Sequence, residues 1–297
     1  MSLLAHNPQF DLSSRRSLTL ISLICRMLFV TVLILWGTGA AVAQDPASYL
    51  ALGDSISLGY NPFVPLTTRN LLRHYHGYPQ DVSALLNLDL ANASCPGQTS
   101  SSFLGFPPDN GCTPWRSYPL PLFVTYSSLA ETQEEYAISF LAAHPHTQLV
   151  TITIGGDDLL YLEEVTCAGS ESCEEAELPG VLATFSTNLS KIYATIRSTG
   201  YQGPIVAVNY PSPDYKNVFE TEAVGALNLA TFNVTQLFNG RVADAFSAFK
   251  LVSVLGDGLP CVVGLSFFNP SGPGCDVHPT PLGQLLMADL VLREIRK

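Results

Sequence analysis

The sequence predicts an α/β fold, a three-layer α/β/α sandwich built around a five-stranded parallel sheet. Three observations lead to this prediction. Short apolar runs alternate with amphipathic stretches along the chain, which is the order that parallel strands and crossover helices require. The chain has 297 residues, of which 47% are hydrophobic, so it can bury a large core. No linker or repeat interrupts residues 44–297, which we expect to form one domain.

Five apolar runs predict the strands. Several are unbroken β-branched runs rather than alternating ones, as expected for strands covered on both faces. The runs span residues 48–52, 88–93, 148–154, 204–209 and 250–254.

Amphipathic stretches between and after these runs predict the helices. We expect Pro179 and Pro281 in the first turns of two of them, where proline is tolerated. The stretches span residues 81–87, 129–143, 179–198, 221–238 and 281–296.

The N-terminal segment predicts export. A basic pair at positions 15 and 16 precedes the apolar residues 17–36, and Ala41-Val42-Ala43 then resembles a cleavage site. We therefore expect residues 1–43 to be a signal peptide and the protein to be secreted. The alternative is an uncleaved membrane anchor, which Arg26 disfavours because a charge in the bilayer is costly.

The cysteines beyond the N-terminal segment are even in number, which in an exported chain indicates disulfides. Many pairings are possible, and closeness in sequence favours 95–112, 167–173 and 261–275. The six residues are Cys95, Cys112, Cys167, Cys173, Cys261 and Cys275. The sequence has no Cys-x-x-Cys or His-Glu-x-x-His, so we expect no metal.

The charge of the chain excludes one class of partner. A net charge of −11, with only 14 lysines and arginines, argues against nucleic-acid binding. We expect a monomer whose contact with a membrane is limited to the N-terminal segment.

Two distant motifs suggest nucleophilic catalysis. Gly53-Asp54-Ser55 directly follows the first predicted strand, where glycine permits a tight turn. His278 precedes Pro279 shortly before the last helix, so we expect it on a loop. A serine hydroxyl is a weak nucleophile and needs a neighbouring base, which histidine can be near neutral pH.

With these motifs the chain resembles the SGNH/GDSL hydrolases. Gly53-Asp54-Ser55 is similar to the nucleophile block and Gly97 to the glycine of the second block. Gly155-Gly156-Asp157-Asp158 is similar to the third block, Gly-x-Asn-Asp, and His278 to the last. The resemblance implies a flavodoxin-like sandwich without a cofactor. It also implies ester hydrolysis through an acyl-enzyme on Ser55, with His278 as base and an oxyanion hole at Ser55, Gly97 and position 157.

Position 157 departs from the family pattern, which has asparagine there. An ionised carboxylate only accepts hydrogen bonds, so an ionised Asp157 would oppose an oxyanion. Either Asp157 is held protonated, or the backbone N–H groups of Ser55 and Gly97 form the oxyanion hole alone.

The acid that orients the histidine also departs from the pattern. The family usually has aspartate three residues before the histidine, where this chain has Cys275. Asp276 lies two residues before it, so either Asp276 or a main-chain carbonyl orients His278.

Residues near strand ends are the candidates for substrate binding. We expect Phe103, Leu104, Phe106 and Phe123 to line an acyl pocket, with Tyr210 from the loop after the fourth strand. These side chains favour lipid or fatty-acyl esters as the substrate over acetylated carbohydrates. The alternative to an enzyme is a non-catalytic ligand-binding module, because the departures from the family pattern at Asp157 and Cys275 are consistent with a loss of catalytic activity.

Overall fold

The computed structural model describes residues 47–65, 68, 72–107, 112, 115 and 131–297. In this part of the chain five strands form one parallel sheet in the order β2-β1-β3-β4-β5. The strands are β1 (Ser48–Gly53), β2 (Asp89–Asn92), β3 (Leu149–Thr153), β4 (Ile205–Val208) and β5 (Arg241–Ala243). The predicted fold class is confirmed.

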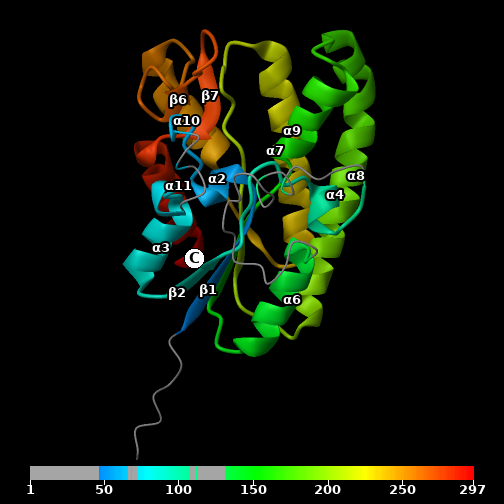
Figure 1. Cartoon of the computed structure of the whole chain (residues 1–297), viewed down its shortest axis with the longest axis vertical. Coiled ribbons are helices and arrows are strands. Elements are labelled where there is room, and N and C mark those ends of the chain that lie inside the picture. Colours follow the sequence, from blue (N-terminus) through cyan, green and yellow to red (C-terminus); the bar gives the residue numbers. More distant parts are fainter. Residues whose placement is uncertain (1–46, 66–67, 69–71, 108–111, 113–114, 116–130) are drawn as a thin grey trace, which may run out of the picture. The chain divides into compact units, whose positions relative to one another are not determined.

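Helices cover both faces of the sheet, which makes three layers (Figure 1). The helices α3 (Tyr78–Leu86) and α11 (Pro281–Ile295) pack together on one face. The other face carries α6 (Gln133–Ala143), α8 (Glu171–Ser198) and α9 (Val218–Leu237). All residues of β1, β3 and β4 are buried, which explains why these segments read as continuous apolar runs.

The predicted fifth strand was wrong. Residues 250–253 belong to α10 (Ala245–Ser253), which Asp244 caps by accepting a hydrogen bond from Ser247 N–H. The apolar residues there follow helical spacing, since Phe249 is fully buried whereas Leu251 is 76% exposed. The real β5 has three residues, too few to stand out in the sequence.

The predicted start of the long helix was also wrong. The α8 helix begins at Glu171 and Pro179 lies inside it, not in its first turn. Pro281 does occupy the first turn of α11, as predicted.

An antiparallel hairpin follows the sheet and was not predicted. It pairs β6 (Ser266–Phe268) with β7 (Cys275–Pro279), so His278 lies on a strand and not on the expected loop. The Cys261–Cys275 disulfide joins the start of β7 to the preceding segment. The Cys95–Cys112 and Cys167–Cys173 disulfides are also formed, so all three predicted pairings are confirmed.

The predicted N-terminal segment, residues 1–43, lies outside the described residues. Among the helices that the structure describes, none combines the length and the apolar character needed to cross a bilayer.

Candidate active site

The turn after β1 brings Ser55 to the carboxyl end of the sheet. Gly53 has φ 127° and lies so close to β3 that a Cβ would come 1.9 Å from the carbonyl oxygen of Thr153. The next amide, Asp54 N–H, donates to the same carbonyl at 3.0 Å. Only glycine fits this approach, so the residue before the Asp-Ser pair is determined by backbone geometry.

A short helix, α2 (Ser55–Leu58), begins at the serine itself. Asp54 is its N-cap, and its Oδ1 accepts a hydrogen bond from Ile56 N–H at 2.9 Å. Ser55 is 9% exposed, so its hydroxyl is almost enclosed.

Three side chains form a continuous hydrogen-bonded chain. His278 Nε2 lies 2.9 Å from Ser55 Oγ, and His278 Nδ1 lies 2.5 Å from Asp276 Oδ1. The same Asp276 oxygen accepts the backbone N–H of His278 at 2.9 Å. Asp276 and His278 are two residues apart on β7, and alternate residues of a strand project to the same face.

This arrangement favours one tautomer of the neutral imidazole. An ionised Asp276 only accepts, so Nδ1 carries the ring proton and donates it to the carboxylate. Nε2 is then an acceptor for the hydroxyl proton of Ser55. The geometry therefore suits proton transfer from Ser55 to His278 as the serine attacks.

Two glutamines hold the turn formed by Gly53, Asp54 and Ser55 from opposite sides. Gln133 Oε1 accepts Gly53 N–H at 2.5 Å, and its Nε2 donates to Gly53 O at 3.0 Å. Gln284 Nε2 donates to Ile56 O at 2.9 Å, and its Oε1 accepts Tyr78 N–H at 2.8 Å. Both glutamines are 1% exposed. Sequence reasoning missed them, because each lies on a helix far along the chain and belongs to no motif.

Gly97 lies on a second turn, which is hydrogen-bonded to the turn that carries Ser55. It has φ 75°, a conformation that favours glycine. Cys95 N–H donates to Gly53 O at 3.0 Å, and the Cys95–Cys112 disulfide anchors the same turn. Ser57 Oγ donates to Ser94 Oγ at 2.6 Å. The turn with Gly97 is therefore held next to α2.

A third turn, after β3, carries Asp157 in the first turn of α7 (Gly156–Tyr161). The following residue, Asp158, accepts Ser100 N–H at 2.8 Å and Ser100 Oγ–H at 2.6 Å. Ser100 begins α4 (Ser100–Phe103), three residues after Gly97. Asp158 thus joins the second and third turns, while Asp157 faces the cavity described next.

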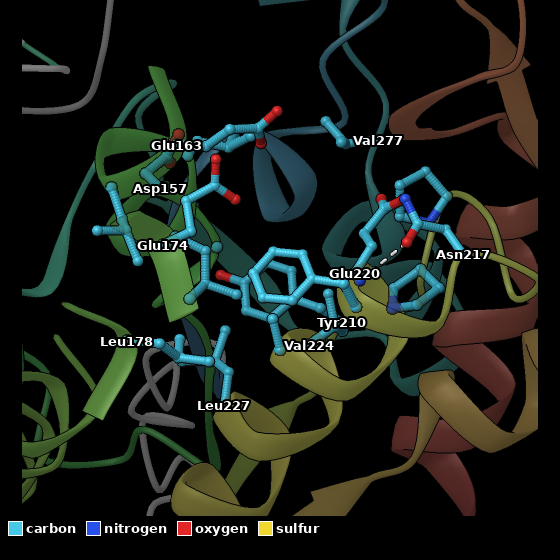
Figure 2. A pocket seen from close by; sticks show the side chains of 18 of the residues that line it. Asp157, Glu163, Glu174, Leu178, Tyr210, Asn217, Glu220, Val224, Leu227 and Val277 are labelled. Atoms are coloured by element: carbon cyan, nitrogen blue, oxygen red, sulfur yellow. Dashed lines mark hydrogen bonds between the residues drawn. The ribbon is translucent and has the colours of Figure 1, made fainter. Parts of the chain in front are cut away.

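A cavity of about 360 Å³ opens beside Ser55, between α7, α8 and α9. A volume of this size is typical of a site for a small molecule. Figure 2 shows Tyr210, Val224 and Leu227 on one side of it, with Glu163 and Glu174 opposite. Much of the lining is apolar and comprises Ile56, Leu159, Leu160, Leu162, Leu178, Pro211, Pro213, Phe219, Ala223, Val224, Leu227 and Val277.

All charged residues among those described around the cavity are acidic. They are Asp54, Asp157, Glu163, Glu171, Glu174 and Glu220. Burial, together with the nearby Glu174 and Glu164, raises the pKa of Glu163. Burial, then Asp214 and Glu163, raises the pKa of Glu220 to about 7. Neighbouring carboxylates contribute to both shifts, and the ionised carboxylates of the lining give the cavity a negative potential.

Asp54 is a further buried carboxyl that the sequence motif contained but did not explain. Burial raises its pKa to about 6, against the opposing effects of a hydrogen bond from Tyr210 and the charge of His278. The Tyr210 hydroxyl donates to Asp54 Oδ2.

The residues predicted to bind substrate are found in different places. Tyr210 lines the cavity. Phe103 is 1% exposed and Leu104 is also buried, and both belong to the hydrophobic core and not to the lining of this cavity. Phe106 is 44% exposed, under the Lys191 ammonium, and does not line the cavity either. Phe123 lies outside the described residues.

Comparisons with known proteins agree with this fold. The profile of the GDSL-like Lipase/Acylhydrolase family matches residues 49–291. Phospholipase A1 from Streptomyces albidoflavus NA297 is similar in structure, with a TM-score of 0.56, 20% identity, and coverage of 84% of this chain and 99% of that one. An extracellular lipase from Streptomyces rimosus has a TM-score of 0.56, 21% identity and the same coverage, 84% and 99%.

An esterase structure is also similar. A catalytic mutant of an acetylxylan esterase from Geobacillus stearothermophilus has a TM-score of 0.54 and 16% identity, and covers 84% of this chain and 94% of that one. None of the curated proteins compared with the chain matches it significantly.

Proposed function

The chain belongs to the GDSL-like lipase/acylhydrolase family, and on that premise we propose that it is a serine hydrolase that cleaves carboxylic esters through an acyl-enzyme on Ser55. The observation that carries the proposal is the 2.9 Å separation of Ser55 Oγ and His278 Nε2, which are 223 residues apart in the sequence. The contact joins residues near the two ends of the domain sequence and allows the imidazole to activate the serine hydroxyl as a nucleophile.

In the proposed reaction Ser55 Oγ attacks the carbonyl carbon of the ester while His278 Nε2 takes its proton. His278 then returns this proton to the leaving alcohol, and the acyl group stays on Ser55. Water, deprotonated by His278, then attacks the acyl carbon; the bond to Ser55 Oγ breaks, His278 returns the proton to Oγ, and the carboxylic acid leaves. Asp276 stabilises the imidazolium that forms in both steps.

The oxyanion is assigned to the backbone N–H groups of Ser55 and Gly97, on turns that are hydrogen-bonded to each other through Gly53 O. The contribution of Asp157 depends on its protonation. A neutral carboxyl would donate to the oxyanion, and an ionised one would repel it.

The cavity supports a substrate with an uncharged, apolar acyl chain. Apolar side chains contact such a chain, and its burial is favourable by about 25 cal/mol per Å². The surrounding carboxylates disfavour an acyl chain that ends in an anion, because two like charges 4 Å apart repel by about 4 kcal/mol at an effective dielectric constant of 20. We accordingly favour lipid or fatty-acyl esters.

The three disulfides support secretion, since such bonds persist in oxidising compartments. Removal of residues 1–43 as a signal peptide is part of the proposal, and the N-terminus of the exported protein, determined by mass spectrometry, tests it.

Hydrolysis of p-nitrophenyl esters of increasing acyl length, with Ser55→Ala as the control, tests the activity. We expect turnover that the substitution abolishes, and labelling by an organophosphonate on the peptide that contains Ser55. Equal background in both proteins would instead indicate a non-catalytic binding module. A marked preference for acetylated sugars would indicate a carbohydrate esterase.

Charge selection is tested with acyl chains of equal length. p-Nitrophenyl butyrate should react faster than the mono-p-nitrophenyl ester of succinate, and the difference should shrink at high ionic strength. Equal rates for the two esters would contradict the assignment of this cavity to the acyl chain.

A further inference from the structure

We propose that Tyr210 is a positioning residue that fixes two turns relative to each other at the proposed catalytic site. One is the nucleophile turn, formed by Gly53, Asp54 and Ser55, and the other is the turn after β3. The inference rests on the proposed function and adds a residue to it. Tyr210 follows β4, so it would connect the ends of three adjacent strands, β1, β3 and β4.

The first connection is made by the hydroxyl group. Tyr210 O–H donates to Asp54 Oδ2, while Asp54 Oδ1 accepts Ile56 N–H at 2.9 Å. Asp54 is 2% exposed and Tyr210 6%, so water does not compete for this bond. Both carboxylate oxygens of the residue before Ser55 are therefore held in place.

The second connection is made by the aromatic ring. A Cβ on Gly156 would come 2.5 Å from Tyr210 Cε1, so the ring lies directly against the backbone of the turn after β3. Asp157 is the next residue, and its charge also acts on the Tyr210 phenol. Tyr210 thus contacts both the turn that carries Ser55 and the turn that carries Asp157.

Tyr210 is itself anchored from behind. Asn228, on α9, accepts Tyr210 N–H through Oδ1 at 2.9 Å and donates to Tyr210 O through Nδ2 at 2.8 Å. Because both the N–H and the C=O of Tyr210 are hydrogen-bonded to Asn228, the backbone that carries the ring and the hydroxyl is held in place.

The hydroxyl also influences protonation. The groups that face Asp54 are Tyr210, His278 from β7 and Tyr78 from α3. Burial raises the pKa of Asp54 to about 6, and the Tyr210 bond opposes that rise. Without the bond the pKa of Asp54 would be higher, so its charge, which attracts the imidazolium of His278, would be lost at a higher pH.

Tyr210→Phe tests this role, since it removes the hydroxyl and keeps the ring. We expect kcat for p-nitrophenyl butyrate to fall between about tenfold and a hundredfold, as for the loss of a hydrogen bond to a charged group, with KM changed less than about twofold. The acid limb of the pH profile of kcat/KM should change its position, because Asp54 and His278 interact. The matched control is Tyr193→Phe, which removes a buried hydroxyl bonded to Thr235 away from the site.

Gly156→Ala tests the ring contact independently. The added methyl would displace the Tyr210 ring, so kcat should again fall while thermal unfolding shows that the protein is folded. Gly225→Ala is the control, because a Cβ at this position of α9 meets nothing within 4 Å.

Wild-type kcat and an unmoved acid limb in Tyr210→Phe would overturn the inference. So would a fall in kcat of the same size in Tyr193→Phe. The Ser55→Ala protein separates this outcome from failure of the proposed function. If wild-type turnover does not depend on Ser55, both the proposed function and the role of Tyr210 are wrong. If turnover depends on Ser55 but Tyr210→Phe changes nothing, only the role of Tyr210 is wrong.

Discussion

Replacing Asp276 with alanine should remove the group that sets the tautomer of His278. In the folded protein Asp276 Oδ1 lies 2.5 Å from His278 Nδ1 and 2.9 Å from the backbone nitrogen of His278. The two side chains are only 15% and 16% exposed, so solvent screens their interaction weakly.

The size of the effect follows from two contributions. Loss of a hydrogen bond to a charged group costs about 1.5–3 kcal/mol. The attraction between a carboxylate and the imidazolium that forms during attack is about 4 kcal/mol at 4 Å and an effective dielectric constant of 20. The two overlap, and together they predict that kcat/KM falls about 10²- to 10³-fold, since each 1.4 kcal/mol is a factor of about ten.

The assay is the initial rate of p-nitrophenyl butyrate hydrolysis across pH 5–9, about the range in which a histidine changes charge. Asp289→Ala is the matched control, because Asp289 forms an exposed i,i+4 pair with Arg293 on α11 and should be neutral. Thermal unfolding of both variants checks that they are folded. A loss of only a few-fold in Asp276→Ala would refute the reasoning and leave the orientation of His278 to a main-chain carbonyl.

Three further predictions concern the same region. Asp157→Asn should raise kcat and remove the alkaline limb of the pH profile if Asp157 acts as a neutral donor; an unchanged rate and profile would eliminate that role. Burial raises the pKa of Glu220 to about 7 from 4.5, so the folded protein holds this proton more tightly than the unfolded chain, and stability is lost as pH rises through that window. Glu220→Gln should therefore raise the free energy of unfolding at pH 8 by about 1–2 kcal/mol, after allowance for partial solvent exposure, and should not change it at pH 4. Thermal unfolding at the two pH values measures this, and Glu222→Gln, exposed on the same helix, should leave Tm unchanged. Replacing Cys261 and Cys275 with alanine should lower stability by about 2–4 kcal/mol and also lower kcat/KM, because their disulfide anchors the strand that carries His278; an unchanged kcat/KM would show that β7 is held without it.

The secondary structure illustrates where sequence patterns are reliable. The buried strands β1, β3 and β4 were predicted because both faces of a central strand need apolar residues. The fifth strand was misplaced because residues 250–254 contain two valines and a leucine, which suit a strand and a helix equally at that length. These residues are helical because Asp244 caps the helix and its apolar face packs against the core.

The proposed catalytic residues show the same division between local and long-range contacts. Gly53, Asp54 and Ser55 are consecutive, and Asp54 caps the helix that begins at Ser55, so a short motif was enough to predict the turn. The Asp276–His278 contact was left open because it depends on whether the segment is extended. Pairing of β7 with β6 makes it extended, and then residues two apart share a face.

The sequence by itself determined the fold class, the family and the pairing of cysteines that are close along the chain, because these depend on local spacing and periodic burial. Only the tertiary structure decided that Tyr210 meets Asp54, that Gln133 and Gln284 hold the nucleophile turn, and that the cavity is lined with carboxylates. Such contacts join residues far apart in sequence. They arise when the strand order and helix packing bring those residues together, and no local pattern of residue types encodes that placement.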